Sequence, residues 1–309
     1  MWNKNCPKCN NQRVVKNGKK YWRQAYKCKI CGHKFVSQSR SKNVKANNLR
    51  DEYSSWKQTY EQLAVNTWCS RKTIQRIFDW NVEVEEIFYN EDLAPRPSYF
   101  VTDVSWFGKK LAVLMIKSCC YKKVIYAKVI DKECIEEYAI GMDFIEQRWW
   151  KILGVTSDWF KWLRQLFSCY AYQFCQFHQL KLITMYLTRK PILEQGKELR
   201  KIALDLKNSN YYETKLRLDI RFAKYWDFLK EKSYSDTWRW WYTHRKIRSA
   251  YRSLRTNLDV LFTYQDHLWM YNTTNMLEWY FRPLKAKIGV HCWLSRDRKI
   301  KLLFKLLAG

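Results

Sequence analysis

The chain has 309 residues and a formal net charge of +28, because it contains 57 Lys and Arg residues but only 29 Asp and Glu residues. A globular chain this basic repels itself unless a polyanion neutralises it, which indicates nucleic acid as the partner. An anionic membrane is the alternative partner, but the sequence has no run of 18 apolar residues, no lipidation motif and no secretory signal. We therefore expect a cytoplasmic, nucleoid-associated protein that binds double-stranded DNA and consists of several domains.

Two Cys-x-x-Cys pairs lie near the start of the chain, at Cys6 and Cys9 and at Cys28 and Cys31. Each pair presents two thiolates on one side of a turn, and the separation between the pairs is typical of a tetrahedral zinc site. A segment this short buries little apolar surface, so the metal supplies its folding energy. We predict a structural zinc ribbon over residues 1–36. The cysteines outside the two pairs, Cys175 excepted, are predicted to be small core residues.

Helical periodicity follows a polar linker and covers residues 49–80. Thr59 begins one helix with a capping-box pattern, and Ser70 is the predicted N-cap of the last helix. That helix has an apolar side, and its opposite side carries Arg71, Lys72, Gln75 and Arg76. This arrangement is typical of a helix-turn-helix whose last helix enters a DNA groove. A small three-helix spacer with a solvated basic face is the alternative interpretation.

A mixed sheet is predicted beyond an acidic boundary that ends at residues 95–97. Apolar runs indicate three strands in a meander, a helix, a fourth strand, a second helix and a fifth strand. In chain order these elements are 99–103, 111–117, 123–130, 133–150, 152–155, 160–167 and 171–174. This is the order of a ribonuclease-H-like fold, in which the first strand is central and the fourth lies beside it.

Three carboxylates fall on separate predicted elements. Asp103 and Asp158 each end an apolar strand, and Glu278 lies in a helix that Thr274 or Asn275 would cap. A single Asp at the end of a strand is usually a helix N-cap. Three acids that converge can instead hold two Mg²⁺ ions, because hard cations prefer oxygen ligands.

The chain from residue 180 to about 257 is predicted to be helical. Residues 238–246 alternate aromatic and cationic side chains, which suits base stacking and phosphate binding or, equally, the edge of an aromatic core. Pro283 is predicted to end or kink the helix of Glu278. Arg282 and Lys285 on that helix are candidate contacts to a DNA backbone.

Several motifs, in this order, resemble a known family. They are CPKC and CKIC, the helix-turn-helix, Asp103, TSD ending at Asp158, CQFH from Cys175 to His178, YTHRKIRSAYRSLRTNL, and TTNMLE ending at Glu278. The chain is similar to prokaryotic insertion-sequence transposases of the Mutator-like DDE superfamily that carry an N-terminal zinc ribbon. The resemblance implies a zinc ribbon, a helix-turn-helix, an α/β ribonuclease-H-like core, an all-α insertion and a C-terminal return to the core. The implied boundaries are 1–36, 49–80, 98–188, 189–270 and 271–309.

The resemblance also implies a mechanism. Asp103, Asp158 and Glu278 would hold two Mg²⁺ or Mn²⁺ ions, with water activated to hydrolyse a phosphodiester at the terminal inverted repeats of the element. The freed 3′-OH would then attack target DNA, and the protein would act as a homodimer or a higher oligomer. Cys175 and His178 would either contact metal or brace the site, and His291 would contact phosphate or lie on the surface. A catalytically inactive DNA-binding protein and a structure-selective nuclease are the alternatives.

Glycine is unusually rare in the chain, with 8 residues against 17 Trp, whereas average usage of Gly is about 7%. Trp159, Trp279 and Trp293 lie where members of the family have Gly, and Trp22, Trp56 and Trp68 lie at turn-like positions. Bulky side chains at such positions would crowd tight turns. We hypothesise that the gene uses UGA for Gly and that the printed sequence translates UGA as Trp. Were they genuine, Trp159 and Trp279 would obstruct the acids beside them.

Overall fold

The computed structural model describes residues 5–20, 23–36, 58–79, 87–158, 160–290 and 294–308. The chain divides into two compact units, Met1–Trp80 and Asn81–Gly309. The predicted linker, the part of the predicted helical region before residue 58, His291, and positions 22, 56, 159 and 293 lie outside the described residues. Among the helices that the structure describes, none is long and apolar enough to cross a membrane.

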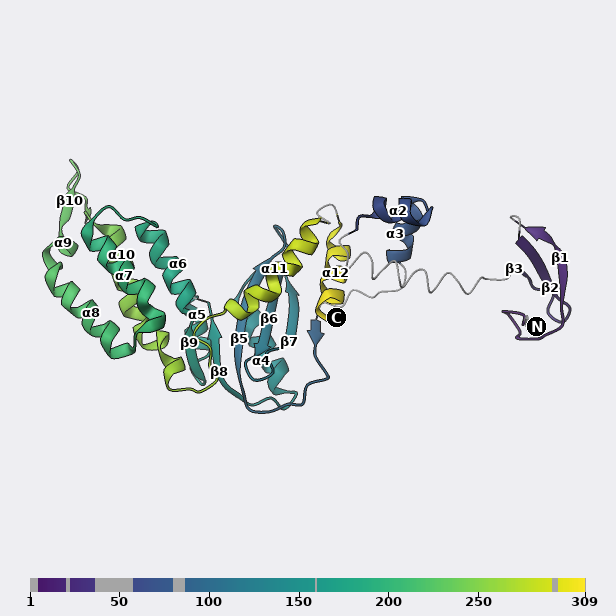
Figure 1. Cartoon of the computed structure of the whole chain (residues 1–309), viewed down its shortest axis with the longest axis horizontal. Coiled ribbons are helices and arrows are strands. Elements are labelled where there is room, and N and C mark those ends of the chain that lie inside the picture. The colour runs from purple at the N-terminus through teal and green to yellow at the C-terminus, as the bar shows by residue number, and fades with distance from the viewer. Residues whose placement is uncertain are drawn as a thin grey trace. The chain divides into compact units, whose positions relative to one another are not determined.

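The first unit contains a small antiparallel sheet and two short helices (Figure 1). Its three strands, which pair in chain order, are β1 (Val14–Lys20), β2 (Arg23–Cys28) and β3 (Lys34–Val36). Helix α2 (Tyr60–Thr67) begins with the predicted capping box, because the N–H of Thr59 donates to Gln62 Oε1 and the N–H of Gln62 donates to Thr59 Oγ1. Helix α3 (Arg71–Asp79) follows Ser70, whose hydroxyl accepts the N–H of Thr73 as an N-cap does.

The second unit is built on a six-stranded mixed sheet, which confirms the predicted mixed α/β class. The strands are β4 (Ile87–Tyr89), β5 (Ser98–Trp106), β6 (Ala112–Ser118), β7 (Val124–Ile130), β8 (Ile152–Ser157) and β9 (Ala171–Phe174). Their order in the sheet is β4-β7-β6-β5-β8-β9 (Figure 1). The meander β5-β6-β7 is antiparallel, while β8 and β9 run parallel to β5. Strand β5 therefore lies between β6 and β8.

Strand β4 was not expected, because its segment was predicted to be a domain boundary. The run Ile87–Tyr89 pairs antiparallel with the outer edge of β7. The hydroxyl of Tyr89 also accepts the indole N–H of buried Trp150 at 3.1 Å. Three consecutive β-favouring side chains outweigh the acidic residues that surround them, because they cover an otherwise exposed edge.

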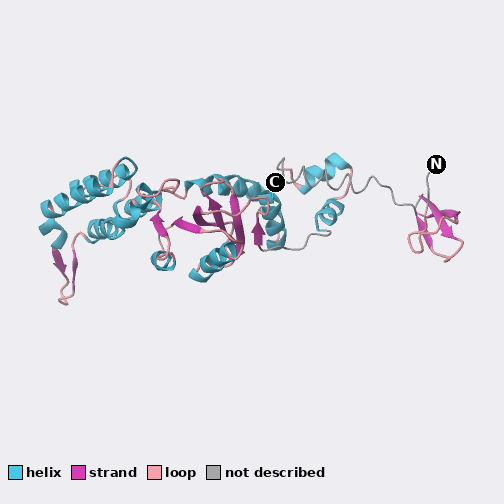
Figure 2. Ribbon diagram, turned by 90° about the horizontal axis from the view of Figure 1, so that it is seen from below, coloured by secondary structure: helices cyan, strands magenta, loops and turns pink. Residues whose placement is uncertain are grey.

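Helices cover both sides of this sheet (Figure 2). Helix α4 (Ile135–Glu146) packs on one face, where its Gly141 lies against the side chains of Ile116 and Tyr126. Helix α11 (Asn275–Val290) packs on the other face, where the ring of Tyr280 lies 4.3 Å from the amine of Lys117. Successive side chains of a strand point to opposite faces, so the α4 face and the α11 face of the sheet are distinct.

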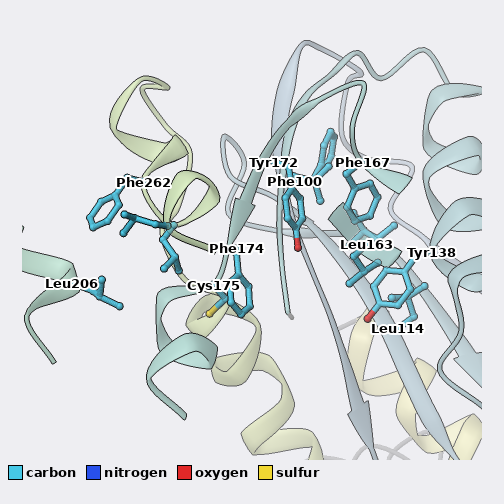
Figure 3. Packing of buried hydrophobic residues seen from close by; sticks show 14 of the residues in the cluster. Phe100, Leu114, Tyr138, Leu163, Phe167, Tyr172, Phe174, Cys175, Leu206 and Phe262 are labelled. Atoms are coloured by element: carbon cyan, nitrogen blue, oxygen red, sulfur yellow. The ribbon is translucent and has the colours of Figure 1, made fainter. Parts of the chain in front are cut away.

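Aromatic and aliphatic side chains fill the core on the α4 face. Helix α5 (Lys161–Leu166) adds Leu163, and the turn after it adds Phe167, to a cluster with Phe100, Leu114 and Tyr138 (Figure 3). These side chains are almost completely buried. Burial of one such side chain is worth about 1.5–3 kcal/mol, so the core holds the strands in a single register.

The helical segment expected after the fifth strand is present. Its helices are α6 (Gln176–Leu187), α7 (Glu194–Asp205), η1 (Leu206–Asn208), α8 (Tyr211–Lys224), α9 (Trp226–Lys230), α10 (Arg245–Asn257), η2 (Leu258–Leu261) and η3 (Thr263–Gln265). The prediction that it is entirely helical is wrong, because β10 (Lys232–Tyr234) and β11 (Trp240–Tyr242) form an antiparallel hairpin. Aromatic residues favour the strands, and the Ser235-Asp236 pair favours the turn between them.

Pro283 was predicted to end or kink the helix of Glu278, and it does not end it, since α11 continues to Val290. Leu277, Phe281, Leu284 and Ile288 are buried on either side of the proline. Their packing offsets the one backbone hydrogen bond that proline cannot make. A further helix, α12 (Arg296–Ala308), follows and was not predicted.

Gly154 should be essential to the strand that leads to Asp158. A Cβ atom at this position would lie 2.6 Å from the carbonyl oxygen of Ala171 on β9. We expect Gly154→Ala to destabilise the second unit by about 1–3 kcal/mol through overpacking, measured by urea denaturation.

Gly289→Ala on α11 is the matched control, because a Cβ there meets no atom within 4 Å. This variant should be neutral or gain up to about 1 kcal/mol from helix propensity. Equal effects of the two substitutions would contradict the close approach of β8 to β9.

Candidate functional site

Four cysteine side chains gather at one end of the small sheet. The sulfur atoms of Cys6, Cys9, Cys28 and Cys31 all lie within 4.8 Å of one another. Cys6 Sγ lies 3.5 Å from Cys31 Sγ, and Cys9 Sγ lies 3.6 Å from Cys28 Sγ. Zn–S bonds of about 2.3 Å in a tetrahedron place sulfur atoms roughly 3.8 Å apart. The cluster therefore has the ligand type, number and spacing to hold a zinc ion.

Backbone N–H groups lower the pKa of two of these thiols, which favours the thiolate form that binds metal. Burial raises the pKa of Cys6, but N–H groups of Cys9 and Lys8 outweigh it and lower the pKa to about 7. The N–H of Cys31 likewise lowers the pKa of Cys28. The N–H of Asn11 lowers the pKa of Cys9, but the neighbouring sulfurs together outweigh it and raise the pKa to about 12. Four thiolates this close repel one another, and a divalent cation relieves that repulsion.

Asp103 and Asp158 lie on neighbouring parallel strands. Asp103 is in the middle of β5, and Asp158 directly follows β8. Asp103 pairs with Met115, two residues before Lys117, so its side chain is on the α11 face of the sheet. Thr156, which shares a face with Asp158, donates its hydroxyl to the carbonyl of Tyr271 in the segment before α11. Both carboxylates thus face the start of α11.

The carboxyl group of Asp103 is buried and electrostatically coupled to its neighbour. Burial raises the pKa of Asp103 to about 7, and the charge of Asp158 also raises it. The N–H of Val104, 2.8 Å from Asp103 Oδ1, and the hydroxyl of Thr274 act in the opposite direction. Such a pair of acids is unfavourable when both are ionised, unless a cation lies between them.

Thr274 fixes the start of α11 above these acids. It is completely buried, and its N–H donates to Cys175 Sγ at 3.2 Å. Its hydroxyl lies 3.4 Å from His178 Nδ1 and also interacts with Asp103. The hydroxyl reaches Cys175 Sγ as well, at 3.6 Å. One small residue therefore contacts β5, the end of β9 and α6 together.

Cys175 and His178 both contact Thr274, and His178 also contacts Asp158. The Cys175 thiol is buried, which raises its pKa, and it accepts hydrogen bonds from Thr274. Nδ1 of His178 lies 3.4 Å from Asp158 Oδ1, and burial lowers the pKa of the ring. A largely neutral imidazole that holds a carboxylate orients that carboxylate without neutralising it.

Glu278 lies in the first turn of α11, one turn beyond Thr274, and is exposed. Its charge raises the pKa of His178, as does that of Asp158. The segment before α11 is tied down by two further bonds, from Gln176 N–H to the carbonyl of Asn272 and from the Asn272 amide to Gln176 Oε1. Among the described residues the three acids do not form a group with ligand atoms all within 4.8 Å, as the four cysteines do.

Glu133 is a fourth acid near this site that the sequence analysis missed. It follows β7, which runs parallel to β5, so both strands end at the same edge of the sheet. The hydroxyl of Tyr138 donates to it at 2.6 Å. Burial raises the pKa of Glu133, and the charge of Asp158 adds to this effect. The signal in the sequence was an acid three residues after the third apolar run.

The predicted DNA-contacting residues are on helix surfaces. On α3, Arg71, Lys72 and Arg76 are exposed and Gln75 is half-buried, while Ile74 faces inward. Arg71 forms an exposed ion pair with Glu61 at 2.9 Å. Arg282 and Lys285 are exposed on α11, opposite its buried side.

No family model matches the chain, and no curated protein is significantly similar to it in sequence.

The folding of the small sheet should depend on zinc. We expect Cys9→Ser to abolish stoichiometric zinc binding and to unfold residues 5–36, because structural zinc contributes roughly 10–16 kcal/mol to such modules. Zinc content by metal analysis and amide chemical shifts of this segment provide the measurement.

Cys69→Ser, at a half-buried cysteine outside the cluster, is the matched control and should leave zinc content unchanged. Retention of zinc by Cys9→Ser with unchanged affinity would contradict a four-cysteine site.

Asp103 should destabilise the second unit at neutral pH when no divalent cation is present. Its folded-state pKa of about 7 exceeds the unfolded value near 3.8. The unfolded chain therefore releases its proton first, and stability falls as pH rises from about 4 to 7. A difference of about three units between the folded and unfolded pKa corresponds to a loss of roughly 4 kcal/mol in the free energy of unfolding. Asp103→Asn should remove this loss, as measured by urea denaturation across that range.

Asp143→Asn, at an exposed acid on α4, should retain the pH profile of the parent protein. If Asp103→Asn has the same profile as well, the burial of a charged carboxyl group at residue 103 is refuted.

Proposed function

We propose that the protein is a DNA transposase of the DDE type, which binds the ends of its element, hydrolyses a phosphodiester there and joins the 3′-OH to target DNA. The central observation is the coupled pair Asp103 and Asp158, which lie beneath the start of the helix that carries Glu278. Metal-assisted phosphodiester chemistry requires acids that share the metal ions, and Glu278, in the first turn of α11, is the third acid that would join this pair. The strand order, with β5 central and β8 parallel beside it, supports a ribonuclease-H-like core.

The acids fit divalent cations by their chemistry. Asp103 is buried, its pKa is raised by burial and by Asp158, and carboxylate oxygens are the preferred ligands of Mg²⁺ and Mn²⁺. Asp103, Asp158 and Glu278 are the residues that would hold the ions. When bound, such ions polarise the phosphodiester and lower the pKa of an attacking water or 3′-OH.

The surrounding residues would orient the acids. His178 holds Asp158 from the α6 side, while Cys175 and Thr274 anchor α11 and so set the position of Glu278. Burial keeps His178 largely neutral, so it does not compete with a cation for the carboxylate. Tyr138 orients Glu133, which adds negative potential around Asp158.

Three surfaces have the chemistry of DNA contacts. The exposed cations of α3 suit a groove, and Arg282 and Lys285 lie within two turns of Glu278 and suit the backbone near the cleaved bond. On the hairpin, Tyr234 pairs with Trp240, whose ring lies 4.2 Å from the amine of Lys232. Exposed rings beside cations suit unpaired bases.

A DNA-binding protein without catalytic activity is the second candidate. The observation that favours it is Trp279, which is 83% exposed next to Glu278. An indole at this position would hinder the approach of a DNA backbone to the acids. This candidate uses only the zinc cluster, α3 and the basic surface.

Strand transfer by purified protein distinguishes the candidates. Labelled duplexes from the DNA that borders the gene, a target plasmid and Mg²⁺ should give nicked ends and joined products. Asp158→Asn should reduce both by roughly a thousandfold, because metal-assisted charge stabilisation is worth several kcal/mol. End binding by the variant should remain within about twofold of the parent protein.

Asp143→Asn is the matched control and should cleave and join normally. Lys72→Ala should weaken binding to the element ends. It should also reduce the slope of log binding constant against log salt concentration by about one, because one fewer counterion is released. Cleavage without joining would indicate a nuclease, and end binding without any Mg²⁺-dependent product would indicate the second candidate. Either outcome would overturn the proposal.

A further inference from the structure

Tryptophan occupies backbone positions that suit glycine. Seven non-glycine residues in the described part of the chain have φ between 52° and 78°, and four of them are Trp. They are Trp68, Trp149, Trp238 and Trp269, with φ of 52°, 68°, 56° and 78°. Trp accounts for only 17 of 309 residues overall. Left-handed backbone brings Cβ too close to the next carbonyl oxygen, and Gly alone avoids this contact.

Two of the four positions end helices with the same motif. After α2, the N–H of Trp68 donates to the carbonyl of Val65, and the N–H of Cys69 donates to that of Ala64. After α4, the N–H of Trp149 donates to Glu146 and that of Trp150 to Ile145. Both are Schellman motifs, whose left-handed residue is usually Gly.

The other two positions, Trp238 and Trp269, lie in turns that also need a residue in the left-handed conformation. In the β10–β11 hairpin, Trp238 N–H donates to Ser235 and Ser235 N–H donates to Arg239, so Trp238 is the left-handed residue that follows a tight turn. Hairpins with such a loop place Gly there. In the turn closed from Met270 N–H to the His267 carbonyl, Trp269 is the third residue. A φ of 78° at this position is typical of a type II turn, where Gly or Asn is favoured.

The side chains of the four Trp residues are largely exposed. Their exposed fractions are 96%, 88%, 84% and 69%, and none has a hydrogen bond or ring contact with another described residue. Trp150, the neighbour of Trp149, behaves differently: it is 2% exposed, and its N–H donates to Tyr89. The four Trp residues at left-handed positions therefore differ from Trp150, whose side chain is part of the core, and they lie at positions that suit a residue with no side chain.

We infer that residues 68, 149, 238 and 269 are encoded by UGA and are inserted as glycine in the organism from which the gene comes. The printed sequence then results from a genetic code that reads UGA as Trp. Backbone conformation supports this at one residue named by the sequence analysis, Trp68, and adds three that motif comparison did not find. The inference is independent of the proposed function.

One consequence concerns the acids. Trp279 is 83% exposed on α11 and is the neighbour of Glu278, at a position where the resembled family has Gly; its backbone is helical, so its φ gives no evidence for Gly there. As glycine, it would leave the surface beside Glu278 open to a DNA backbone. The natural protein would then lack the obstruction that favours the inactive candidate.

The codons and the mass of the natural protein test the inference directly. Peptides from source cells that span residues 68, 149, 238 and 269 should have the mass of glycine at each position, and the gene should have UGA at all four. The codon of Trp150 should be UGG. UGG at the four positions, or tryptophan in the peptides, would overturn the inference whatever the outcome of the transposition assay.

Recombinant variants of the printed sequence test the physical basis. Trp149→Gly should lower the unfolding equilibrium constant about fivefold relative to Trp149→Ala, because alanine retains the left-handed strain whereas both variants remove the exposed indole. Trp150→Gly, in the core, should instead raise the unfolding constant at least a hundredfold. Equal stability of the Gly and Ala variants at residue 149 would contradict the backbone argument.

Discussion

The contact of Thr274 with Cys175 and His178 is the constraint on which the candidate site depends. Glu278 is 120 residues beyond Asp158 in the sequence, and most of the helical segment separates them. The chain returns to the sheet because buried hydrogen bonds to Cys175 Sγ, together with those between Gln176 and Asn272, fix the residues just before α11. These bonds are made in a buried environment, where leaving either partner unsatisfied is unfavourable. The position of the third acid is therefore set by polar contacts at one point, and the apolar side of α11 holds the remainder of the helix.

The same point determines the electrostatics of the site. Asp103 is buried among apolar strands, next to a second carboxylate, so the fold opposes its ionisation. His178 lies against Asp158 but is largely neutral because it too is buried, and Glu133 adds another negative group. In the free protein the repulsion between Asp103 and Asp158 is relieved when Asp103 takes up a proton, and a bound cation would relieve it with both carboxylates ionised. Under the proposed function, activity and stability would have opposite requirements at Asp103, as is common where a site is prepared for a charged ligand.

Much of the architecture could be predicted from the sequence, because local signals were strong. The spacing of Cys6, Cys9, Cys28 and Cys31 predicted their cluster, and alternating apolar runs predicted the strands from β5 to β9. The hairpin β10–β11 was missed because it lies inside a long helical pattern and contains only three residues per strand. Strand β4 was missed because acidic neighbours masked a short apolar run, and α11 passes through Pro283 because tertiary packing outweighs local propensity. Glu133 was missed although an acid after the third apolar run was visible, because its proximity to Asp158 depends on the burial and packing that only the fold provides.

The tryptophans show which kind of information sequence patterns lack. Motif comparison can question a Trp only where a neighbouring motif predicts another residue, as at Trp279 beside Glu278. Trp149, Trp238 and Trp269 have no such neighbour, and each is identified by a dihedral angle and by the backbone bonds that impose it. Two Schellman motifs and two turns form in the structure although the printed residue is unfavourable in all four, because the surrounding helices and strands fix the path of the backbone. The backbone conformation at each of these positions therefore indicates glycine, whatever residue is printed there. The printed Trp side chain extends into solvent and leaves the path of the backbone unchanged.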